Sequence, residues 1–191
     1  MAITKNNKWR KWRVGVVVWV LICLASVLTH ATPPADLESR VKAAFIYNFA
    51  KFVEWPEQVL QGKDNTILLC AIEDTDFGQA FDLIEEKIVK GRKMVYQCCP
   101  RLSSELNVCH IVYLNSQDPK IIQEVLRSLK GRHVLTIGEQ EGFVQLGGII
   151  NLYSSDNKIR FEINVDAANR AGLKLSSQLL KLAKIYREEP K

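Results

Sequence analysis

Cysteine is the residue type whose number and spacing most clearly indicate chemistry in this chain of 191 residues. Cys23 lies in an apolar N-terminal run, and four others follow it: Cys70, Cys98, Cys99 and Cys109. An even number of cysteines in a protein exported to an oxidising compartment is typical of disulfide formation. The four fall in or at the ends of three neighbouring predicted strands, so all three ways of pairing them stay open from the residues alone.

Histidine offers little for catalysis. Beyond the first 31 residues only His110 and His133 occur, and both fall in predicted strands. The sequence contains neither the Gly-x-Ser-x-Gly turn of serine hydrolases nor the His-Glu-x-x-His helix of zinc proteases. The glycines of residues 138–142 and 147–148 lack the spacing of a dinucleotide fingerprint or a phosphate-binding loop, and we interpret them as turns. These residues predict a protein that is not an enzyme and that uses no cofactor or metal.

The first 31 residues predict a cleavable export signal. Basic residues without an acidic one precede the apolar run Val14–Leu28, and Thr29-His30-Ala31 offers a small-x-small cleavage site. The apolar run is fifteen residues long, whereas a membrane-spanning helix needs about 20. An uncleaved N-terminal anchor is the alternative. We therefore expect a periplasmic protein whose mature chain, residues 32–191, forms one domain.

The net charge of the chain belongs to this leader. The formal charge is +5, from 26 Lys and Arg against 21 Asp and Glu, and the leader holds five of the basic residues and none of the acidic ones. The mature chain is thus neutral overall. A neutral domain gives no electrostatic argument for a nucleic-acid partner, which would require a basic face.

Apolar runs alternate with helical patterns through the middle of the chain, which predicts an α/β fold. Strands are predicted at residues 66–72, 93–98, 109–114 and 133–137, with helices near residues 77–84 and 118–129. This alternation favours a mostly parallel sheet flanked by helices, in a Rossmann-like arrangement with right-handed crossovers. We expect a single domain in which a C-terminal antiparallel hairpin and a helix extend the sheet.

A long amphipathic helix is predicted over residues 36–53. Its apolar stripe recurs at spacings of three and four residues and comprises Val41, Ala44, Phe45, Asn48, Phe49 and Phe52. Pro56 ends the helix, because proline disfavours helical geometry in the residue before it. We interpret the stripe mainly as core, with Asn48 as a hydrogen-bonded interior amide. The alternative is that the helix end forms a pocket or partner surface with Phe52, Glu54 and Trp55.

The C-terminal stretch, residues 142–186, predicts a hairpin followed by a helix. Strands at residues 149–153 and 158–164 flank a polar connection, which fits a longer hairpin loop rather than a tight two-residue turn. Helical spacing of apolar residues over 175–186 then predicts a helix capped by Ser176 or Ser177. The second strand alternates, and we interpret its polar face as solvated. The alternative is a ligand or partner surface formed by Arg160, Glu162 and Asn164.

Four segments carry a resemblance to a known family. They are VKAAFIYNFAKFVEWP near the N-terminus and GGIINL, IRFEIN and AGLKLSSQLLKLA toward the C-terminus. With them the chain resembles the YfiR family of small secreted bacterial proteins over roughly residues 41–183. The resemblance implies a disulfide between Cys70 and Cys109, since the family prototype has cysteines at the matching positions. The prototype's second pair falls on Val144 and Asn151, which argues against carrying over a family-wide redox role.

The resemblance also implies a function. The family prototype binds the periplasmic domain of a membrane diguanylate cyclase and holds it inactive, and an outer-membrane lipoprotein relieves the inhibition. Carried over, this chain lowers cyclic-di-GMP without touching the nucleotide, by favouring the inactive state of the cyclase. The alternative is a periplasmic small-molecule-binding module that serves a sensor kinase or an outer-membrane receptor. The sequence is also compatible with a homodimer. It identifies neither a ligand nor the signal that relieves the inhibition.

Overall fold

The computed structural model describes residues 34–61, 65–72, 77–101 and 103–189 of the chain. From Ala35 onward the chain forms one compact unit with an α/β architecture, as the sequence predicts. The predicted leader over residues 1–31 and the predicted start of the mature chain at Thr32 lie outside the described residues.

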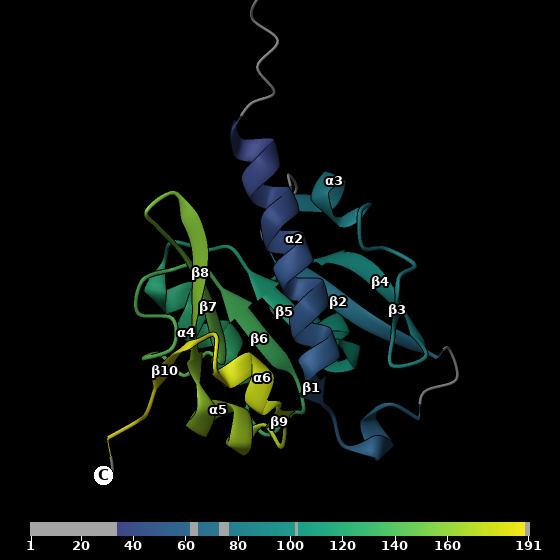
Figure 1. The fold of residues 1–191 in the computed structure, drawn as a ribbon. Coiled ribbons are helices and arrows are strands. Elements are labelled where there is room, and N and C mark those ends of the chain that lie inside the picture. Colours follow the sequence, from purple (N-terminus) through teal and green to yellow (C-terminus); the bar gives the residue numbers. More distant parts are fainter. Residues whose placement is uncertain (1–33, 62–64, 73–76, 102, 190–191) are drawn as a thin grey trace, which may run out of the picture. The chain divides into compact units, whose positions relative to one another are not determined.

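An eight-stranded mixed sheet forms the centre of this unit (Figure 1). From one edge to the other its strands are β10 (Lys184–Tyr186), β8 (Lys158–Asn164), β7 (Ile150–Ser155), β6 (Leu135–Gly138), β5 (Ile111–Leu114), β2 (Thr66–Ile72), β4 (Arg92–Cys99) and β3 (Ile88–Val89). All neighbouring pairs are parallel except β7–β8 and β3–β4. The predicted mostly parallel sheet with an antiparallel C-terminal hairpin is therefore confirmed.

Helical segments connect and flank the strands. They are α2 (Pro34–Phe52), α3 (Phe77–Phe81), α4 (Pro119–Ser128), α5 (Val165–Arg170) and α6 (Ser177–Leu180), with 3-10 turns η1 (Glu57–Val59) and η2 (Ser104–Val108). A separate two-stranded sheet pairs β1 (Val53–Glu54) with β9 (Lys174–Leu175). Asp118 caps α4 by accepting a hydrogen bond from Lys120 N at 2.8 Å. Among the described helices, none combines the length and apolarity needed to cross a bilayer.

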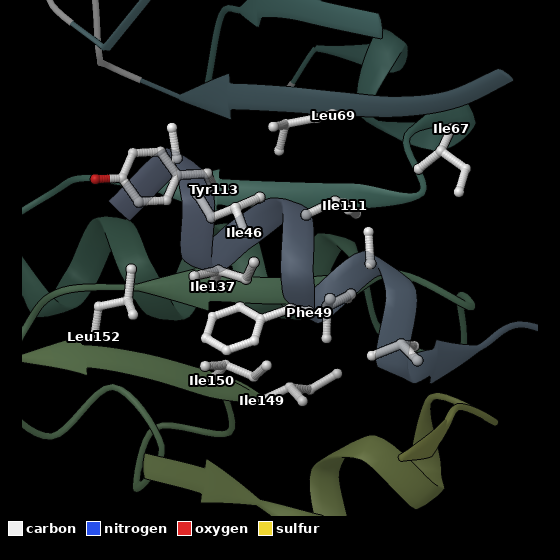
Figure 2. Packing of buried hydrophobic residues seen from close by; sticks show 14 of the residues in the cluster. Ile46, Phe49, Ile67, Leu69, Ile111, Tyr113, Ile137, Ile149, Ile150 and Leu152 are labelled. Carbon is white, nitrogen blue, oxygen red and sulfur yellow. The ribbon is translucent and has the colours of Figure 1, made fainter. Parts of the chain in front are cut away.

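Helix α2 packs on one face of the sheet and covers the larger apolar core (Figure 2). Its buried side chains are Ala43, Ile46, Phe49 and Ala50. The predicted stripe is confirmed at its aromatic residues, since Phe49 is buried and Phe45 and Phe52 pack against the core. It is wrong at Ala44 and Asn48, which are exposed, and the Asn48 amide donates to Ala44 O at 2.9 Å. Apolar residues occur on both sides of this helix. The face turned to the sheet is the one with the small side chains of Ala43 and Ala50, which let two backbones approach closely.

The opposite face of the sheet carries a second apolar cluster, to which α4 contributes Ile122 and Val125. Phe143, in the loop between β6 and β7, is fully buried in this cluster. Gly138 and Gly148 frame its ring, and a Cβ at either glycine would overlap the ring carbons. These two glycines therefore serve close packing, whereas the sequence suggested that they only make turns.

The C-terminal region departs from prediction in two places. The β7–β8 hairpin turns tightly through Asp156 and Asn157, with φ of 52° and 57°, and not through a longer loop. Asp and Asn tolerate the left-handed backbone that such a turn requires. The helix predicted over residues 175–186 is confined to α6, which Ser176 caps by accepting from Leu179 N at 3.2 Å. The chain beyond α6 forms β10 instead, because the edge of β8 offers backbone groups that need partners.

Candidate functional site

The residues predicted as a partner or ligand surface lie in two places. One set, the α2-end group, stands where α2 meets β1 and comprises Phe52, Glu54 and Trp55. The other set, the β8 group, comprises Arg160, Glu162 and Asn164. Phe161 of β8 packs against Phe49 of α2, so the alternation of the strand turns the β8 group to the opposite face of the sheet. The structure therefore does not bring the six residues together.

The α2-end group is fixed by backbone pairing. Phe52 is half-buried, and its carbonyl accepts a hydrogen bond from Ser176 N at 3.0 Å. Glu54 is exposed and pairs across the small sheet with Lys174. Trp55 is buried, and its indole N–H donates to the carbonyl of His110 at 3.3 Å. This arrangement fixes the backbone at Glu54, whose side chain is exposed, and buries Trp55 next to it.

His110 has no nitrogen left for proton transfer. Its Nδ1 accepts from Leu68 N at 3.0 Å, and its other N–H is hydrogen-bonded to the Val59 backbone. Burial lowers the pKa of His110, and the hydrogen bond to Val59 only partly offsets that effect. The ring is therefore neutral at neutral pH and serves to tie β2, β5 and the η1 segment together.

A cavity of about 670 Å³ opens beside His110, at the amino ends of the parallel strands. Its lining includes Leu60, Thr66, Asn107, His110 and His133. His133 also makes a hydrogen bond to the backbone, since its Nδ1 lies 2.7 Å from Ala171 O and must donate to that carbonyl. The cavity mixes apolar walls with hydrogen-bonding groups, which suits the binding of a small molecule better than catalysis.

The β8 group is less solvated than the sequence predicts. Arg160 is exposed, at 3.8 Å from Asp156. Glu162 is buried and takes part in a row across three strands, accepting from Asn151 Nδ2 at 3.2 Å and pairing with Lys184 Nζ at 3.2 Å. The predicted solvated face is therefore wrong at Glu162, because β10 adds beside β8 and brings Lys184 to the carboxylate.

Asn164 is fully buried and works as a structural amide. Its Oδ1 caps α5 by accepting from Ala167 N at 2.8 Å, while its Nδ2 donates to Val144 O at 2.8 Å and to Glu188 Oε1 at 2.9 Å. These bonds join β8, α5, the loop after β6 and the C-terminal segment. A solvated Asn164 is thus a second error of the prediction for this face.

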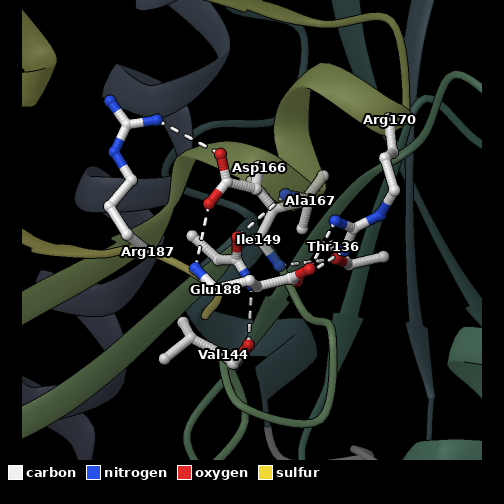
Figure 3. Close-up of polar contacts among 9 residues, drawn as sticks. Thr136, Val144, Ile149, Asp166, Ala167, Arg170, Arg187 and Glu188 are labelled. Atoms are coloured by element: carbon white, nitrogen blue, oxygen red, sulfur yellow. Dashed lines mark hydrogen bonds and ion pairs between the residues drawn. The ribbon is translucent and has the colours of Figure 1, made fainter. Parts of the chain in front are cut away.

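Figure 3 shows the ion pairs around this amide, where Arg187 reaches Asp166 and Arg170 reaches Glu188. The hydrogen bond from Glu188 N lowers the pKa of Asp166, with Arg187 adding to the effect. The Arg170 guanidinium lowers the pKa of Glu188, as does the amide of Asn164. Both carboxyls therefore stay ionised to lower pH than free carboxyls do, and they hold the segment after β10 against α5.

A second cavity, of about 690 Å³, lies between α4 and α5. Four cationic side chains line it: Arg127, Lys130, Arg132 and Arg170. Arg170 is engaged with Glu188, and Arg127 lies 3.5 Å from Gln123 Oε1. Arg127, Lys130 and Arg132 lie close together at and just after the end of α4, whereas Arg170 comes from α5, so the complete rim forms only in the folded chain.

One polar cluster is not predicted by the sequence pattern. Lys42 of α2 lies 2.6 Å from Glu139 Oε2 and 2.7 Å from Glu38, and the hydroxyl of the buried Tyr113 donates to Glu139. Burial lowers the pKa of Lys42, but the hydrogen bonds to Glu139 and Glu38 outweigh it and leave that pKa raised. The cluster connects α2 to the ends of β5 and β6. In the sequence, only Lys42 itself points to this cluster, as a lysine next to apolar residues of the predicted helix.

Cys70 and Cys109 are joined by a disulfide, as the resemblance implies. Cys98 is exposed, and Cys99 is buried beside the disulfide, with the sulfur atoms of Cys70, Cys99 and Cys109 within 4.8 Å of one another. Within the described ranges, this is the one group of His, Cys, Asp and Glu whose ligand atoms converge closely enough for a metal ion. The disulfide leaves a single thiol in it, which is too few for a metal site.

Comparison with known proteins gives a family match over most of the chain. Residues 39–184 match the family described as YfiR/HmsC-like. Among solved structures, the chain is similar to a conserved domain protein from Vibrio cholerae O1 biovar eltor, with 13% sequence identity and a TM-score of 0.48. The similarity covers 69% of this chain and 58% of that protein.

Proposed function

Because the chain belongs to the YfiR/HmsC-like family, we propose that it binds the periplasmic domain of a membrane diguanylate cyclase and keeps that enzyme inactive. The family implies a regulator of a diguanylate cyclase, and the family match over residues 39–184 is the observation that carries the proposal. Inhibition by binding requires that the protein prefer the inactive state of the cyclase, since a ligand with equal affinity for both states shifts nothing.

Local chemistry supports a binding role. Both ring nitrogens of His110 are occupied by backbone partners, so this histidine cannot act as a general base in the described conformation. Glu54 and Arg160 are exposed and Phe52 is half-buried, so these three are the predicted residues that can touch a partner. Trp55, Glu162 and Asn164 are buried and hydrogen-bonded within the chain, so they act by positioning their neighbours.

Deletion of the gene tests the proposal in the cell. Cyclic-di-GMP should rise in the deletion strain, and the rise should vanish when the cognate membrane cyclase is deleted as well. Quantification of the nucleotide in extracts of the single and double deletion strains measures both effects. Unchanged cyclic-di-GMP under several growth conditions would contradict the proposal.

Binding to the purified periplasmic domain of that cyclase tests the surface. Glu54→Lys and Arg160→Glu should each weaken binding on the order of tenfold if their charges face the partner. Glu57→Lys and Lys158→Glu are matched controls, because both residues are exposed and lie within three positions of the residue tested. Equal affinities for the test and control variants would show that neither Glu54 nor Arg160 belongs to the interface.

The cavity beside His110 favours one second candidate, a small-molecule-binding module that serves a sensor kinase or receptor. Trp55 is the one tryptophan of the chain beyond the leader, and its indole is bonded to the His110 carbonyl. Occupation of the cavity should therefore shift the intrinsic fluorescence of the mature protein. A screen of small polar metabolites that leaves this fluorescence unchanged would speak against the second candidate.

A further inference from the structure

The sulfur of Cys99 belongs to the same buried cluster as the Cys70–Cys109 disulfide. The three sulfur atoms lie within 4.8 Å of one another, and each of the three residues is at most 4% exposed. We propose that Cys99 is an exchange partner of this disulfide, so that the cross-link moves between alternative pairs within the cluster. This proposal does not rest on the function proposed above.

The sheet topology explains why the three sulfurs meet. Strand β2 lies between β4 and β5, and Cys70 stands opposite Gln97 of β4. Cys99 is two residues beyond Gln97, so its side chain points to the same face as that of Cys70. Cys109 follows η2 and packs on this face in the cluster that also holds Leu106 and Val112. Cys99 is the last residue of β4, where a small shift of the strand end disrupts few backbone bonds.

The exchange is redox-neutral. Cys99 loses its proton to solvent, and its thiolate attacks Sγ of Cys70 or Cys109. A bond from Cys99 to the attacked sulfur forms, the Cys70–Cys109 bond breaks, and the released thiolate takes up a proton. One thiol and one disulfide are present before and after this step, so it consumes no oxidant and no reductant.

The Cys70–Cys109 disulfide persists at neutral pH because little of the Cys99 thiolate is present. Burial raises the pKa of Cys99 to about 11, and the neighbouring Glu105 and Cys98 add to the rise. The cluster is otherwise lined by apolar side chains and by the carbonyl of Gln97, 4.0 Å from Cys99 Sγ. Exchange at neutral pH is therefore slow and becomes faster in mildly alkaline solution.

The position of the cross-link has a structural consequence. In the Cys70–Cys109 pair, Cys109 ties the end of η2 to β2. If Cys99 pairs with Cys70, the cross-link instead joins β2 to β4 and the η2 segment loses its tether. Asn107, Val108 and Cys109 line the cavity beside His110, so the pairing controls how firmly one wall of that cavity is held.

Peptide mapping of the full chain with Cys98→Ser tests the exchange, since this variant removes the exposed thiol next to Cys99. The protein is incubated at about pH 9 without added reductant, denatured in N-ethylmaleimide and cleaved with trypsin. Lys93 and Arg101 place Cys70, Cys99 and Cys109 on separate peptides. We expect label on Cys70 or Cys109 at about a tenth or more of the level on Cys99, a ratio that corresponds to an isomer about 1.4 kcal/mol less stable.

Label confined to Cys99 after prolonged incubation would overturn the proposal. The double variant Cys98→Ser/Cys99→Ser is the control and should leave Cys70 and Cys109 unlabelled. A second test uses Cys98→Ser/Cys109→Ser and Cys98→Ser/Cys70→Ser, each treated with oxidised glutathione. At least one should form an intramolecular disulfide to Cys99 while its circular dichroism spectrum stays that of the parent, and failure of both folded variants to do so would also refute the exchange.

Discussion

The two faces of strand β8 are both buried toward the end of the strand, but different interactions stabilise them. Phe161 and Ile163 point to α2, and the ring of Phe161 meets Phe49 edge-on with centroids 5.0 Å apart. Glu162 and Asn164 point the other way and are equally buried, but in hydrogen bonds and an ion pair. One face is held by removal of apolar surface from water, whereas the other depends on a partner for each polar atom.

The difference shows which part of burial a sequence encodes locally. Alternation along a strand separates an apolar from a polar face, but it does not say whether the polar face meets water. Here Lys184 and Glu188, some twenty residues along the chain, supply the partners of Glu162 and Asn164. The polar face is closed by the chain's own C-terminal segment, so it is less available to a partner than the exposed Arg160.

Truncation of Phe49 should break the apolar face with the largest effect. Phe49 is 1% exposed and contacts both Phe45 and Phe161. Phe49→Ala should therefore lower the free energy of unfolding by about 3–5 kcal/mol, from lost burial and the cavity left behind. Urea titration followed by circular dichroism measures the change.

The exposed neighbour Asn48 provides the control and tests the phase of the helix. Asn48→Ala should change the free energy of unfolding by no more than about 0.5 kcal/mol, because the residue is a solvent-exposed helix position. A loss below about 1 kcal/mol for Phe49→Ala, or a loss above about 0.5 kcal/mol for Asn48→Ala, would contradict the packing of α2 described above.

Overpacking of the apolar cluster on the other face of the sheet, which α4 covers, should lower stability by a smaller amount. A methyl group at Gly148 would overlap the buried ring of Phe143, and the ring can move only by displacing its neighbours. Gly148→Ala should cost about 1–3 kcal/mol of stability. Gly131→Ala is a useful comparison, because Gly131 has φ of 78° but open space around it, so any loss there reflects backbone strain alone. Thermal unfolding of both variants separates overlap from strain, and equal losses would refute the packing argument.

Much of the fold could be predicted because its signals are local. The apolar runs of β2 and β5 mark buried strands, and Asp118-Pro119 marks the start of α4. The end of the chain could not be predicted in the same way. Leucines at helical spacing fit a long helix, but Lys184–Tyr186 gains more by pairing with the open edge of β8. That gain depends on tertiary structure, which periodicity does not record.

The candidate site could be predicted only in part. Spacing left the cysteine pairing open, and the family resemblance identified Cys70 and Cys109. The residue types at the end of α2 suggested a partner or ligand surface as the alternative to core, but the hydrogen bond from Trp55 to His110 spans 55 positions. The pairing of Lys42 with Glu139 spans 97 positions. Contacts of this kind follow from the arrangement of strands in the sheet, so a local pattern contains no trace of them.

The polar face should respond to loss of Asn164 with a smaller effect. Asn164→Ala removes the cap of α5, which is worth about 0.5–2 kcal/mol, and also the donor to Val144 O. Asn164→Ser keeps a capping oxygen and loses the amide donor, so it should recover part of the loss. Unfolding free energies of the two variants measure the cap separately from the donor. Equal losses for Ala and Ser would show that the cap contributes nothing.

Acid should weaken the outermost part of this polar face, and this is the smallest effect. The folded-state pKa values of Asp166 and Glu188 are both lowered, so their contribution is present above the unfolded pKa and is lost as pH falls through the folded value. About a third of each side chain is exposed, at 32% for Asp166 and 36% for Glu188, so solvent screening keeps the contribution small. The melting temperature of the wild type should therefore exceed that of Asp166→Asn/Glu188→Gln at neutral pH, and the difference should shrink as pH falls below about 4. A difference that stays constant or grows in acid would show that the two carboxylates do not hold the C-terminal segment in place by their charge.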